Sequence, residues 1–411
     1  MTGSQPERPA RSGLDRLRGR ALPKNHDART ISALAANPGC ARRALLDAAG
    51  VDKQRIAAHI GYAAPFGQSQ FAIVRGNAFE AQVKESGGAQ LLTLLREHID
   101  LDVSEVGYAD LNDIGGNDQR ELRHRHTVHV LTGADQPGRT LLDHPLLRLR
   151  VGGRHAYLEP DLIALRLDGT IHVIEIKSFA VIDGQADGGK VAAAAIQSAV
   201  YVRALRDLMA EAGADPAAVS HRTILVAPRD FSSQPTATSL DVRRQLGVLD
   251  RQLSRIASIE DLLARYPGTL TFDLDPDDKG RPRRPAAELA AAIGQVTANY
   301  APECLATCEL CFLCRDEAAG TTGALGKPVR EDLGGIEYTA AALSLAYGQG
   351  EWGPGGMGGG SPAGGKPDAP HAGQLLPTPE RAEIAAQLLR AARLREQVLG
   401  EQVLGDEVSP P

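Results

Sequence analysis

Residues 159–179, EPDLIALRLDGTIHVIEIKSF, are followed after a short linker by residues 190–208, KVAAAAIQSAVYVRALRDL. In the first stretch, two runs rich in Leu, Ile and Val flank Asp168-Gly169, a pair typical of tight turns. Two such runs about a glycine-containing turn predict a β-hairpin. In the second stretch, apolar residues recur at the spacing of a helix. The chain is organised around this hairpin and the helix after it.

The second strand of the hairpin ends in charged residues, in the sequence Glu175-Ile176-Lys177. Side chains alternate along a strand, so Glu175 and Lys177 should lie on one face, with Ile174 and Ile176 on the other. Charged groups at the end of an otherwise buried hairpin are costly unless something compensates them. Together with Asp161 at the start of the first strand, they indicate a divalent metal site.

The helix expected from Lys190 has a regular inward face. Its members are Ala194, Gln197, Tyr201, Leu205 and Leu208. Two interpretations of the polar pair on this face are open. Either Tyr201 is a core residue with Gln197 as its hydrogen-bond partner, or both side chains act at the site on the hairpin.

Three motifs follow one another here: Pro160-Asp161, Glu175-Ile176-Lys177 and Gln197-x-x-x-Tyr201. Their order, the turn between the first two and the helix carrying the third resemble the PD-(D/E)XK nucleases in their RecB-like form. This group includes the CRISPR-associated exonucleases and the nuclease domains of bacterial recombination helicases. The resemblance covers residues 31–345. It implies an α/β, restriction-endonuclease-like fold, with a mixed central sheet flanked by helices and a helical iron–sulfur region.

The resemblance also implies roles for the site residues. The ligands of Mg²⁺ or Mn²⁺ would be Asp161, Glu175, Glu80 (directly or through water) and the backbone carbonyl of Ile176. Three carboxylates at one site repel, by about 3 kcal/mol per pair at ~5 Å and an effective dielectric of ~20, and a divalent cation reverses that balance. Lys177 would position or activate the attacking water. Gln197 and Tyr201 would support the site or orient DNA.

Glu80 belongs to the segment FAIVRGNAFEAQVKE, residues 71–85, where we expect a helix after Gly76. Related nucleases place an acidic residue or a His on the first core helix, and Gly76-x-x-Phe79-Glu80 has that shape. The alternative is a solvent-facing Glu80 paired with Lys84 four residues later.

The register of the hairpin is an internal test of the metal site. With a plain two-residue turn, Leu162 would pair with Glu175, and Asp161 would point to the opposite face from Glu175. The catalytic interpretation therefore requires a three-residue loop or a bulge near Pro160-Asp161.

Four of the five cysteines lie in the segment CLATCELCFLC: Cys304, Cys308, Cys311 and Cys314. The fifth, Cys40, precedes two arginines at an expected helix start. Such a cluster is typical of metal binding in a reducing compartment. Related nucleases hold a [4Fe–4S] cluster with one upstream cysteine and three downstream ones spaced Cys-x₂-Cys-x₅-Cys. Cys308 and Cys314 match the second spacing, whereas Cys304 and Cys308 are one residue too far apart.

Two metal sites built from these cysteines are open. One is a [4Fe–4S] cluster held by Cys40 and three of the four downstream cysteines, and we favour it because the nuclease motifs agree with it. The other is a cluster or a zinc ion held by the four downstream cysteines alone.

Composition limits the class of protein. The chain has 411 residues, 43% of them hydrophobic and 4% aromatic, and a net charge of −6. The hydrophobic content supports a core, and the negative charge argues against a protein that coats nucleic acid. Without a secretory signal or a membrane span of ~20 apolar residues, we expect a cytoplasmic protein that does not enter membranes.

Four regions are expected along the chain. Residues 1–30 form a disordered basic arm, 31–345 the nuclease domain, 346–376 a Gly/Pro-rich linker, and 377–411 an amphipathic helix with a tail. Within the domain, residues 100–157 should be strands and loops with a solvated His-rich patch at His124, His126, His129 and His155. A strand is expected over 221–227, an irregular segment over 228–238, and helices over 239–264 and 286–299.

These expectations add up to a metal-dependent DNA nuclease acting in DNA repair, recombination or phage defence. The family's usual substrate is single-stranded DNA, degraded from an end. No nucleotide-binding GxxxxGK[ST] motif is present, so unwinding would need a helicase or another DNA-processing partner. The alternative is a catalytically silent module that keeps the nuclease fold for DNA binding or scaffolding, with a structural metal at its cysteines.

Overall fold

The computed structural model describes residues 13–37, 39–63, 70–99, 106–112, 114, 119–133, 139–151, 154–167, 170–230, 232–257, 259–347 and 379–405. The chain divides into two compact units. We call residues 1–299 with 306–310 the sheet unit, and residues 300–305 with 311–411 the C-terminal unit.

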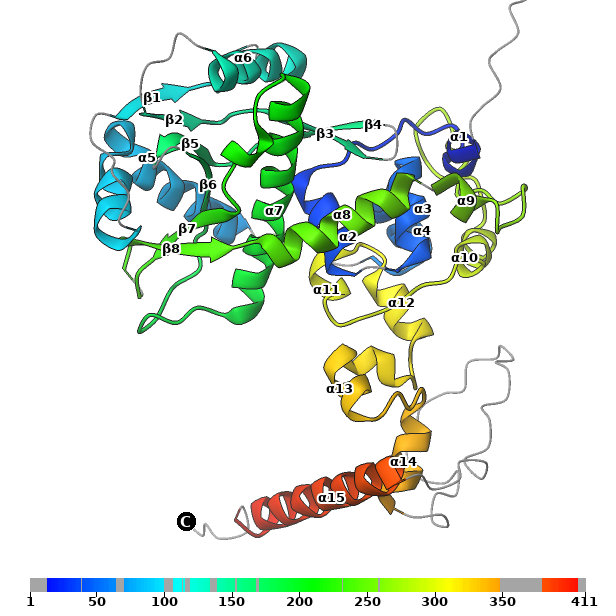
Figure 1. The fold of residues 1–411 in the computed structure, drawn as a ribbon. Helices are drawn as coiled ribbons and strands as arrows, with labels where there is room; N and C mark the ends of the chain where they lie inside the picture. Colours follow the sequence, from blue (N-terminus) through cyan, green and yellow to red (C-terminus); the bar gives the residue numbers. More distant parts are fainter. Residues whose placement is uncertain are drawn as a thin grey trace, which may run out of the picture. The chain divides into compact units, whose positions relative to one another are not determined.

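A six-stranded mixed sheet is the centre of the sheet unit (Figure 1). Its order is β1 (Val106–Asp110), β2 (Arg139–Asp143), β5 (Leu162–Leu167), β6 (Thr170–Ile176), β7 (Arg222–Pro228) and β8 (Pro235–Asp241). The pairs β1–β2 and β6–β7 are parallel, and the other three are antiparallel. A separate two-stranded sheet pairs β3 (Leu147–Val151) with β4 (Arg154–Leu158). The expected α/β class with a mixed central sheet is confirmed.

Helices cover both faces of this sheet (Figure 1). Helix α5 (Gln70–Ile99) packs on one face, against Leu162, Ile174 and Ile176, and we call this the α5 face. Helix α7 (Gly188–Glu211) packs on the other, against Ile163 and Val173, the α7 face. Because neighbouring strand residues alternate between two cores, Glu175 points to the α7 face, as the alternation predicted.

The remaining helices of the sheet unit are α1 (Gly13–Arg18), α2 (Ala28–Ala36), α3 (Ala41–Ala49), α4 (Lys53–His59), α6 (Arg120–Thr132), α8 (Arg243–Ala257), α9 (Ile259–Leu263) and α10 (Ala286–Gly294). Helix α11 (Cys304–Thr307) contains the boundary between the units. The C-terminal unit has α12 (Cys311–Glu317), α13 (Lys327–Asp332), α14 (Thr339–Tyr347) and α15 (Pro379–Gly405). Short 3₁₀ turns occur at Pro216–Ala218 and Thr322–Leu325.

The hairpin contains a bulge of the kind that the metal-site interpretation requires, at a different place from the expected one. Leu167 pairs with Thr170, as in a two-residue turn, but the register then shifts between Ala164 and Leu167. Leu162 consequently pairs with Ile174, so the residue before it, Asp161, falls opposite Glu175. The bulge lies in the middle of β5 and not near Pro160-Asp161, because the strand can gain its extra residue anywhere between turn and site.

Helix α7 follows from its sequence. The side chain of Asp187 caps its N-terminus by accepting a hydrogen bond of 2.8 Å from the backbone N–H of Lys190. The helix begins two residues before the expected Lys190. Ala194, Tyr201 and Leu205 are buried against the sheet, as the spacing predicted.

Helix α5 begins at Gln70, so Gly76 lies inside the helix and does not precede it as expected. The helix is interrupted at Glu85–Gly88, where Ser86, Gly87 and Gly88 have positive φ. A Cβ on Gly88 would come within 3.1 Å of Leu141 Cδ1, so glycine is required there for both conformation and space.

Residues 120–132 form helix α6, although strands and loops were expected over 100–157. The buried face of α6 consists of Arg123, His124, Thr127, Val130 and Leu131, which recur at helical spacing. Three of these residues are polar, and partners satisfy them: Thr127 Oγ1, for example, accepts a hydrogen bond of 3.0 Å from the N–H of Leu146. The helical period was hidden because polar side chains occupy the inward positions.

Part of the N-terminal segment is packed, unlike the disordered arm expected over residues 1–30. Helix α1 buries Leu17 completely, and the N–H of Phe272 donates to the Leu17 carbonyl at 2.7 Å. The Arg18 guanidinium donates to the Ala49 carbonyl at 2.8 Å. A single buried leucine in a basic, proline-containing segment gives no periodic signal. Residues 1–12 lie outside the described residues.

Other boundaries differ slightly from the expectations. Strand β8 occupies residues 235–241, part of which was expected to be irregular. The helices expected over 239–264 and 286–299 are α8 with α9 and α10, and β7 matches the strand expected over 221–227.

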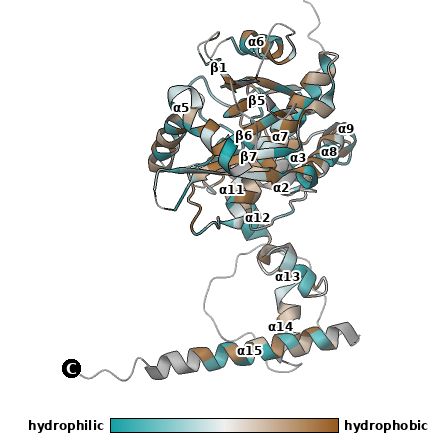
Figure 2. Cartoon of the chain, turned by 60° about the vertical axis from the view of Figure 1, so that its left-hand side comes forward, coloured by the Kyte–Doolittle hydropathy of each residue, from teal (hydrophilic) through white to brown (hydrophobic). Residues whose placement is uncertain are grey.

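The C-terminal unit has a small core of its own, formed by Leu333, Ile336 and Ala342. Ile384 and Leu388 of the expected C-terminal helix, α15, pack against it. Figure 2 shows hydrophobic and hydrophilic residues interspersed along α15. The Gly/Pro-rich linker lies, from residue 348 onward, outside the described residues. In the parts of the chain that are described, no helix has both the length and the apolar character of a membrane span.

Candidate functional site

The strand ends place three predicted residues at one edge of the sheet. Asp161 lies opposite Glu175, and its Oδ2 accepts a hydrogen bond of 2.7 Å from the backbone N–H of Ile176. Lys177 follows the end of β6, where its own N–H donates to the Val226 carbonyl at 2.8 Å. Its ammonium pairs with Oε1 of Glu175. The hairpin thus brings Asp161, Glu175 and Lys177 together.

Glu175 lies in an environment that disfavours its charge. Its side chain is completely buried, and the Lys177 ammonium beside its Oε1 compensates it. Burial, and then the negative charge of Asp161, raise the pKa of Glu175 to about 8, against the opposing effect of Lys177. Asp161 and Glu175 together carry more negative charge than Lys177 balances.

The same surplus of negative charge shifts the pKa values of Asp161 and Lys177. Burial raises the pKa of Asp161, with Glu80 adding to the effect and Lys177 opposing it. Burial alone would lower the pKa of Lys177, but the charges of Glu175 and Asp161 raise it above its usual range. A buried and a half-buried acid of raised pKa beside the ammonium of Lys177 are the arrangement expected of carboxylates that bind a cation.

Glu80 reaches this edge from helix α5. A Cβ placed on Gly76 would lie 3.7 Å from Ser178 Oγ, so the turn before Glu80 lies beside the residue that follows Lys177. The charge of Glu80 acts on Asp161, Glu175 and Lys177. Its carboxylate also pairs with Lys84 at 2.5 Å. The Glu80–Lys84 pair that the alternative interpretation predicted is therefore present. Glu80 nevertheless also lies at the candidate site.

Gln197 and Tyr201 face the site from helix α7. Gln197 Nε2 donates a hydrogen bond of 2.9 Å to the Tyr201 hydroxyl. Burial raises the pKa of Tyr201, and the charges of Glu175 and Asp161 raise it further. Tyr201 is thus both a buried core residue and a neighbour of the two carboxylates. The Ile176 side chain is buried on the α5 face, and a role of its carbonyl as a ligand stays a prediction.

A second polar group at the same edge was not predicted. In the antiparallel pair of β2 with β5, Asp143 lies opposite Leu162, and its side chain points to the α5 face. There Lys84 pairs with Asp143 Oδ1 at 2.6 Å, and the Tyr108 hydroxyl donates to Oδ2 at 2.5 Å. Lys84 therefore lies between Glu80 and Asp143. A single Asp at a strand end has no motif around it, so spacing could not have identified it.

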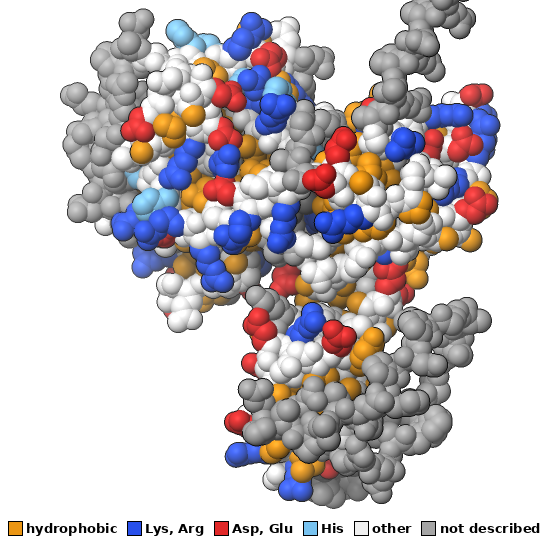
Figure 3. Space-filling view, turned by 45° about the vertical axis from the view of Figure 1, so that its right-hand side comes forward, with side chains coloured by type: hydrophobic (Ala, Val, Ile, Leu, Met, Phe, Trp, Pro, Cys, Tyr) orange, Lys and Arg blue, Asp and Glu red, His pale blue; other side chains and the backbone are white. Residues whose placement is uncertain are grey.

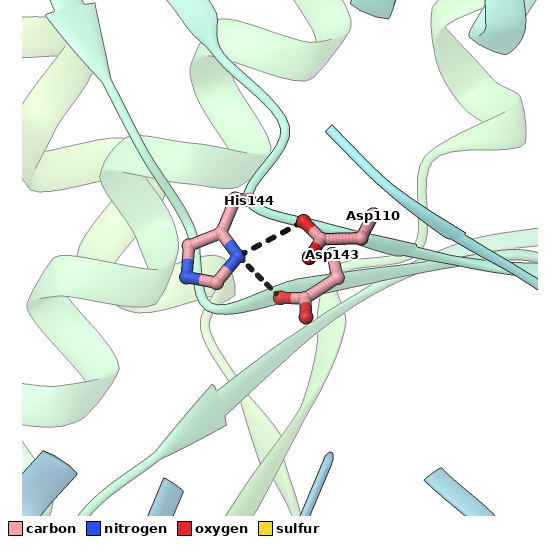
Figure 4. A group of neighbouring side chains, drawn as sticks. All are labelled: Asp110, Asp143 and His144. Atoms are coloured by element: carbon pink, nitrogen blue, oxygen red, sulfur yellow. Dashed lines mark hydrogen bonds and ion pairs between the residues drawn. The ribbon is translucent and has the colours of Figure 1, made fainter. Parts of the chain in front are cut away.

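His144 and Asp110 complete this second group (Figure 4). His144 Nδ1 lies 3.0 Å from Asp143 Oδ1 and 3.4 Å from Asp110 Oδ1. In the described chain, these three residues form the group of possible metal ligands whose atoms lie within 4.8 Å of one another. Burial alone would raise the pKa of Asp143, but hydrogen bonds from His144, Lys84 and Tyr108 lower it to about 2. Its negative charge is already compensated.

The His-rich patch divides between interior and surface. His124 is buried on α6, and its Nδ1 lies 2.9 Å from the Leu146 carbonyl. Burial lowers the pKa of His124. His126 and His129 have ring centroids 6.4 Å apart on the same helix, and His155 is exposed on β4.

In the sheet unit, the segment around Cys308 is held by basic residues of three N-terminal helices. Arg29 donates to the Ala306 carbonyl at 3.3 Å, and Arg43 donates to the Thr307 carbonyl at 2.8 Å. Lys53 pairs with Glu309 at 3.4 Å. Burial raises the pKa of the Cys308 thiol to about 11, and Arg43 and Lys53 oppose this effect.

Cys40 is the N-cap residue of α3, three residues before Arg43, so it begins a helix as expected. In the C-terminal unit, Cys304, Cys311 and Cys314 are buried. Burial raises the pKa of Cys311, and the charge of Cys304 adds to this effect. None of the five cysteines forms a disulfide bond, and the metal they would hold stays a prediction.

Comparisons with known proteins add little. No protein-family model matches the chain, and no curated protein matches it. A solved structure titled "Crystal structure of SSO0001" is 13% identical, and the match covers 59% of this chain and 82% of that one, with a TM-score of 0.23. We therefore interpret the site from its own geometry.

Proposed function

We propose that the chain is a metal-dependent deoxyribonuclease of the RecB-like PD-(D/E)XK type, with a restriction-endonuclease-like fold. One observation carries the proposal. The β5 bulge brings Asp161 opposite Glu175 and next to Lys177, in the motif order that defines these nucleases. A regular hairpin would have turned Asp161 to the other face, so the bulge serves the site and not the pairing of the strands.

The residues at the site fit Mg²⁺ or Mn²⁺. Asp161, Glu175 and Glu80 offer the oxygen ligands that such ions prefer, and the Ile176 carbonyl could add a fourth. Glu175 is fully buried next to Asp161 with Lys177 as its paired cation, and a divalent ion would supply the further compensation that two neighbouring carboxylates need. A bound ion would lower the pKa of a coordinated water and stabilise the charge that develops on the phosphate.

The other site residues have roles that follow from their positions. Lys177 is the cation at the site, so its ammonium would offset phosphate charge and orient the attacking water once the carboxylates bind metal. Gln197 holds the Tyr201 hydroxyl, and together they fix the part of α7 that lies next to the carboxylates.

Single-stranded DNA, attacked from an end, is the substrate that the family resemblance supports, with a helicase or another DNA-processing protein as partner. On the face drawn in Figure 3, basic and acidic side chains are interspersed, in keeping with the net charge of −6. Phosphate binding would therefore depend on local contacts such as Lys177 more than on a broad basic field.

We also propose a [4Fe–4S] cluster held by Cys40 and three of the downstream cysteines, with zinc as the alternative. Burial raises the pKa of the Cys308 thiol, and Arg43 and Lys53 act against this effect; cations beside a thiol favour the thiolate that binds metals, and this supports the proposal. Iron content and visible absorption of protein purified without oxygen distinguish the two. Cys40→Ser should lose an iron–sulfur cluster and should retain a zinc ion held by the four downstream cysteines.

A catalytically silent module is the second candidate. Its support is that the pairs Lys177–Glu175 and Lys84–Glu80 compensate part of the acidic charge without any metal.

Cleavage of end-labelled single-stranded DNA in Mg²⁺ or Mn²⁺ tests the proposal. Wild type and Lys190→Ala, a matched change at an exposed lysine, should cleave, and Lys177→Ala should be slower by at least ~10²-fold. Equal inactivity of all three proteins would support the silent module, and cleavage of RNA alone would change the substrate class.

A further inference from the structure

Lys84 is a nearly buried lysine between two carboxylates of different surroundings. Its side chain is 9% exposed, and its ammonium lies 2.5 Å from Glu80 and 2.6 Å from Asp143. Glu80 belongs to the proposed metal site, whereas Asp143 lies across the neighbouring strand on the α5 face. The position of this ammonium therefore depends on how firmly each carboxylate holds it.

Asp143 is the firmer of the two partners. Its side chain is 5% exposed, against 30% for Glu80. The Tyr108 hydroxyl binds its second oxygen at 2.5 Å, and His144 lies 3.0 Å from the first. Tyr108 lies on the neighbouring strand β1 and His144 directly follows Asp143 in the chain, so two contacts besides Lys84 hold this carboxylate in place.

An ammonium so close to the proposed metal ligands is a possible competitor. Lys84 already acts on Asp161, whose carboxylate its charge stabilises. The carboxylates that would attract a divalent ion attract a lysine for the same reason, and a lysine on a four-carbon chain can move into the site. Within the described structure, the ion pair with Asp143 opposes that movement.

We propose that Asp143 is a positioning residue that keeps Lys84 out of the metal site. The inference rests on the proposed function, because it assumes a divalent ion at Glu80, Asp161 and Glu175. Without the negative charge of Asp143, Lys84 is held by the site carboxylates alone and competes with the ion. With Asp143 present, Lys84 stays paired with Asp143 and Glu80 and does not move onto Asp161 and Glu175.

Binding of Mn²⁺, measured by calorimetry on the full chain, tests this inference without any activity assay. Glu175→Gln identifies the heat that belongs to the proposed site. Asp143→Asn should weaken Mn²⁺ binding by about tenfold or more, as loss of a supporting contact does at metal sites. Asp143→Asn with Lys84→Met should recover wild-type affinity to within about threefold, because the competitor is gone.

Lys84→Met alone gives a second test that does not depend on folding of the Asp143 variant. Its Mn²⁺ affinity should equal or exceed that of wild type. A tenfold loss would overturn the inference, since Lys84 would then support Glu80 instead of competing with the metal. Failure of the double variant to recover would overturn it as well.

Two further outcomes separate this inference from its alternatives. If Mn²⁺ binding is lost in Asp110→Asn and His144→Ala but kept in Glu175→Gln, the metal belongs to the Asp110, Asp143 and His144 group, and both proposals fail. If wild type shows Glu175-dependent binding and Asp143→Asn binds equally well, the inference fails and the proposed function stands.

Discussion

Glu175 and Asp143 are buried carboxylates at the same edge of one sheet, yet their surroundings shift their pKa values in opposite directions. Asp143 accepts hydrogen bonds from Lys84, Tyr108 and His144, and these lower its pKa to about 2. Glu175 pairs with Lys177, but burial and the acidic neighbours Asp161 and Glu80 raise its pKa to about 8. Burial and residue type are similar, so the difference lies in the donors and cations around each carboxylate, and in our proposal the less compensated one, Glu175, binds the metal.

A third buried carboxylate supports the same rule. Asp47 lies in the sheet unit between Arg43 and Lys53, with its Oδ2 3.1 Å from Arg43 Nε. Burial alone would raise the pKa of Asp47, but these two cations lower it. Asp47 and Asp143 are structural because cations and donors surround them, whereas Glu175 and Asp161 are the exceptions that point to function.

The largest expected difference between the two carboxylates is in activity. Glu175→Gln should reduce DNA cleavage by about 10²–10³-fold, because it removes a metal ligand. Asp143→Asn should keep cleavage within about tenfold of wild type when Mn²⁺ is saturating, because it affects affinity for the ion. Cleavage rates over a Mn²⁺ titration measure both. Equal losses at saturating metal would remove the distinction between the two sites.

For the free energy of unfolding, we expect Asp143→Asn to have the larger effect and Glu175→Gln the smaller one. Asp143→Asn leaves Lys84 with a weaker partner and should lower the free energy of unfolding by about 1–3 kcal/mol. Glu175→Gln removes a charge that Asp161 and Glu80 repel, and Lys177 keeps Asp161 as an acidic neighbour, so stability at pH 8 should be unchanged or higher. Urea denaturation of both variants and wild type without metal gives the comparison. A strongly destabilised Glu175→Gln protein would indicate that Glu175 is a structural partner of Lys177.

The two carboxylates should also respond oppositely to pH. The folded pKa of Glu175 lies above its ordinary value of 4.5, so its contribution to stability is present below pH 4.5 and is lost as pH rises towards 8. Asp143 has a folded pKa below 3.8, so its contribution is present above that pH and is lost as pH falls towards 2.

The urea midpoint of wild type relative to each variant follows these contributions. The difference between wild type and Glu175→Gln should change between pH 5 and 8, and that between wild type and Asp143→Asn below pH 4. Parallel curves over both ranges would contradict the assigned environments.

The sequence was sufficient for the local part of the site. Alternation placed Glu175 and Lys177 on one face, and helical spacing placed Tyr201 inward, because both periods act over a few residues. The requirement for a bulge also followed from counting residues. Its position did not, because the pairing of β5 with β6 allows the extra residue at several points.

The non-local part was not predictable from spacing. Lys84 and Asp143 are 59 residues apart in the chain, and they meet because β2 pairs with β5 beneath α5. Helix α6 was missed because its inward face carries Arg123, His124 and Thr127, whose partners lie on other segments. In each case, tertiary contacts bury polar residues, and the pattern of apolar residues along the sequence does not reveal them.

Proton release on metal binding tests the central claim most directly. Because the pKa of Glu175 is about 8, its carboxyl is protonated at pH 7 and must lose the proton to bind Mn²⁺. Calorimetry in buffers of different ionisation enthalpy should show about one proton released per Mn²⁺ at pH 7, and release that falls towards zero above pH 9. Mn²⁺ binding without proton release at pH 7, unchanged in Glu175→Gln, would contradict a metal site at Asp161 and Glu175.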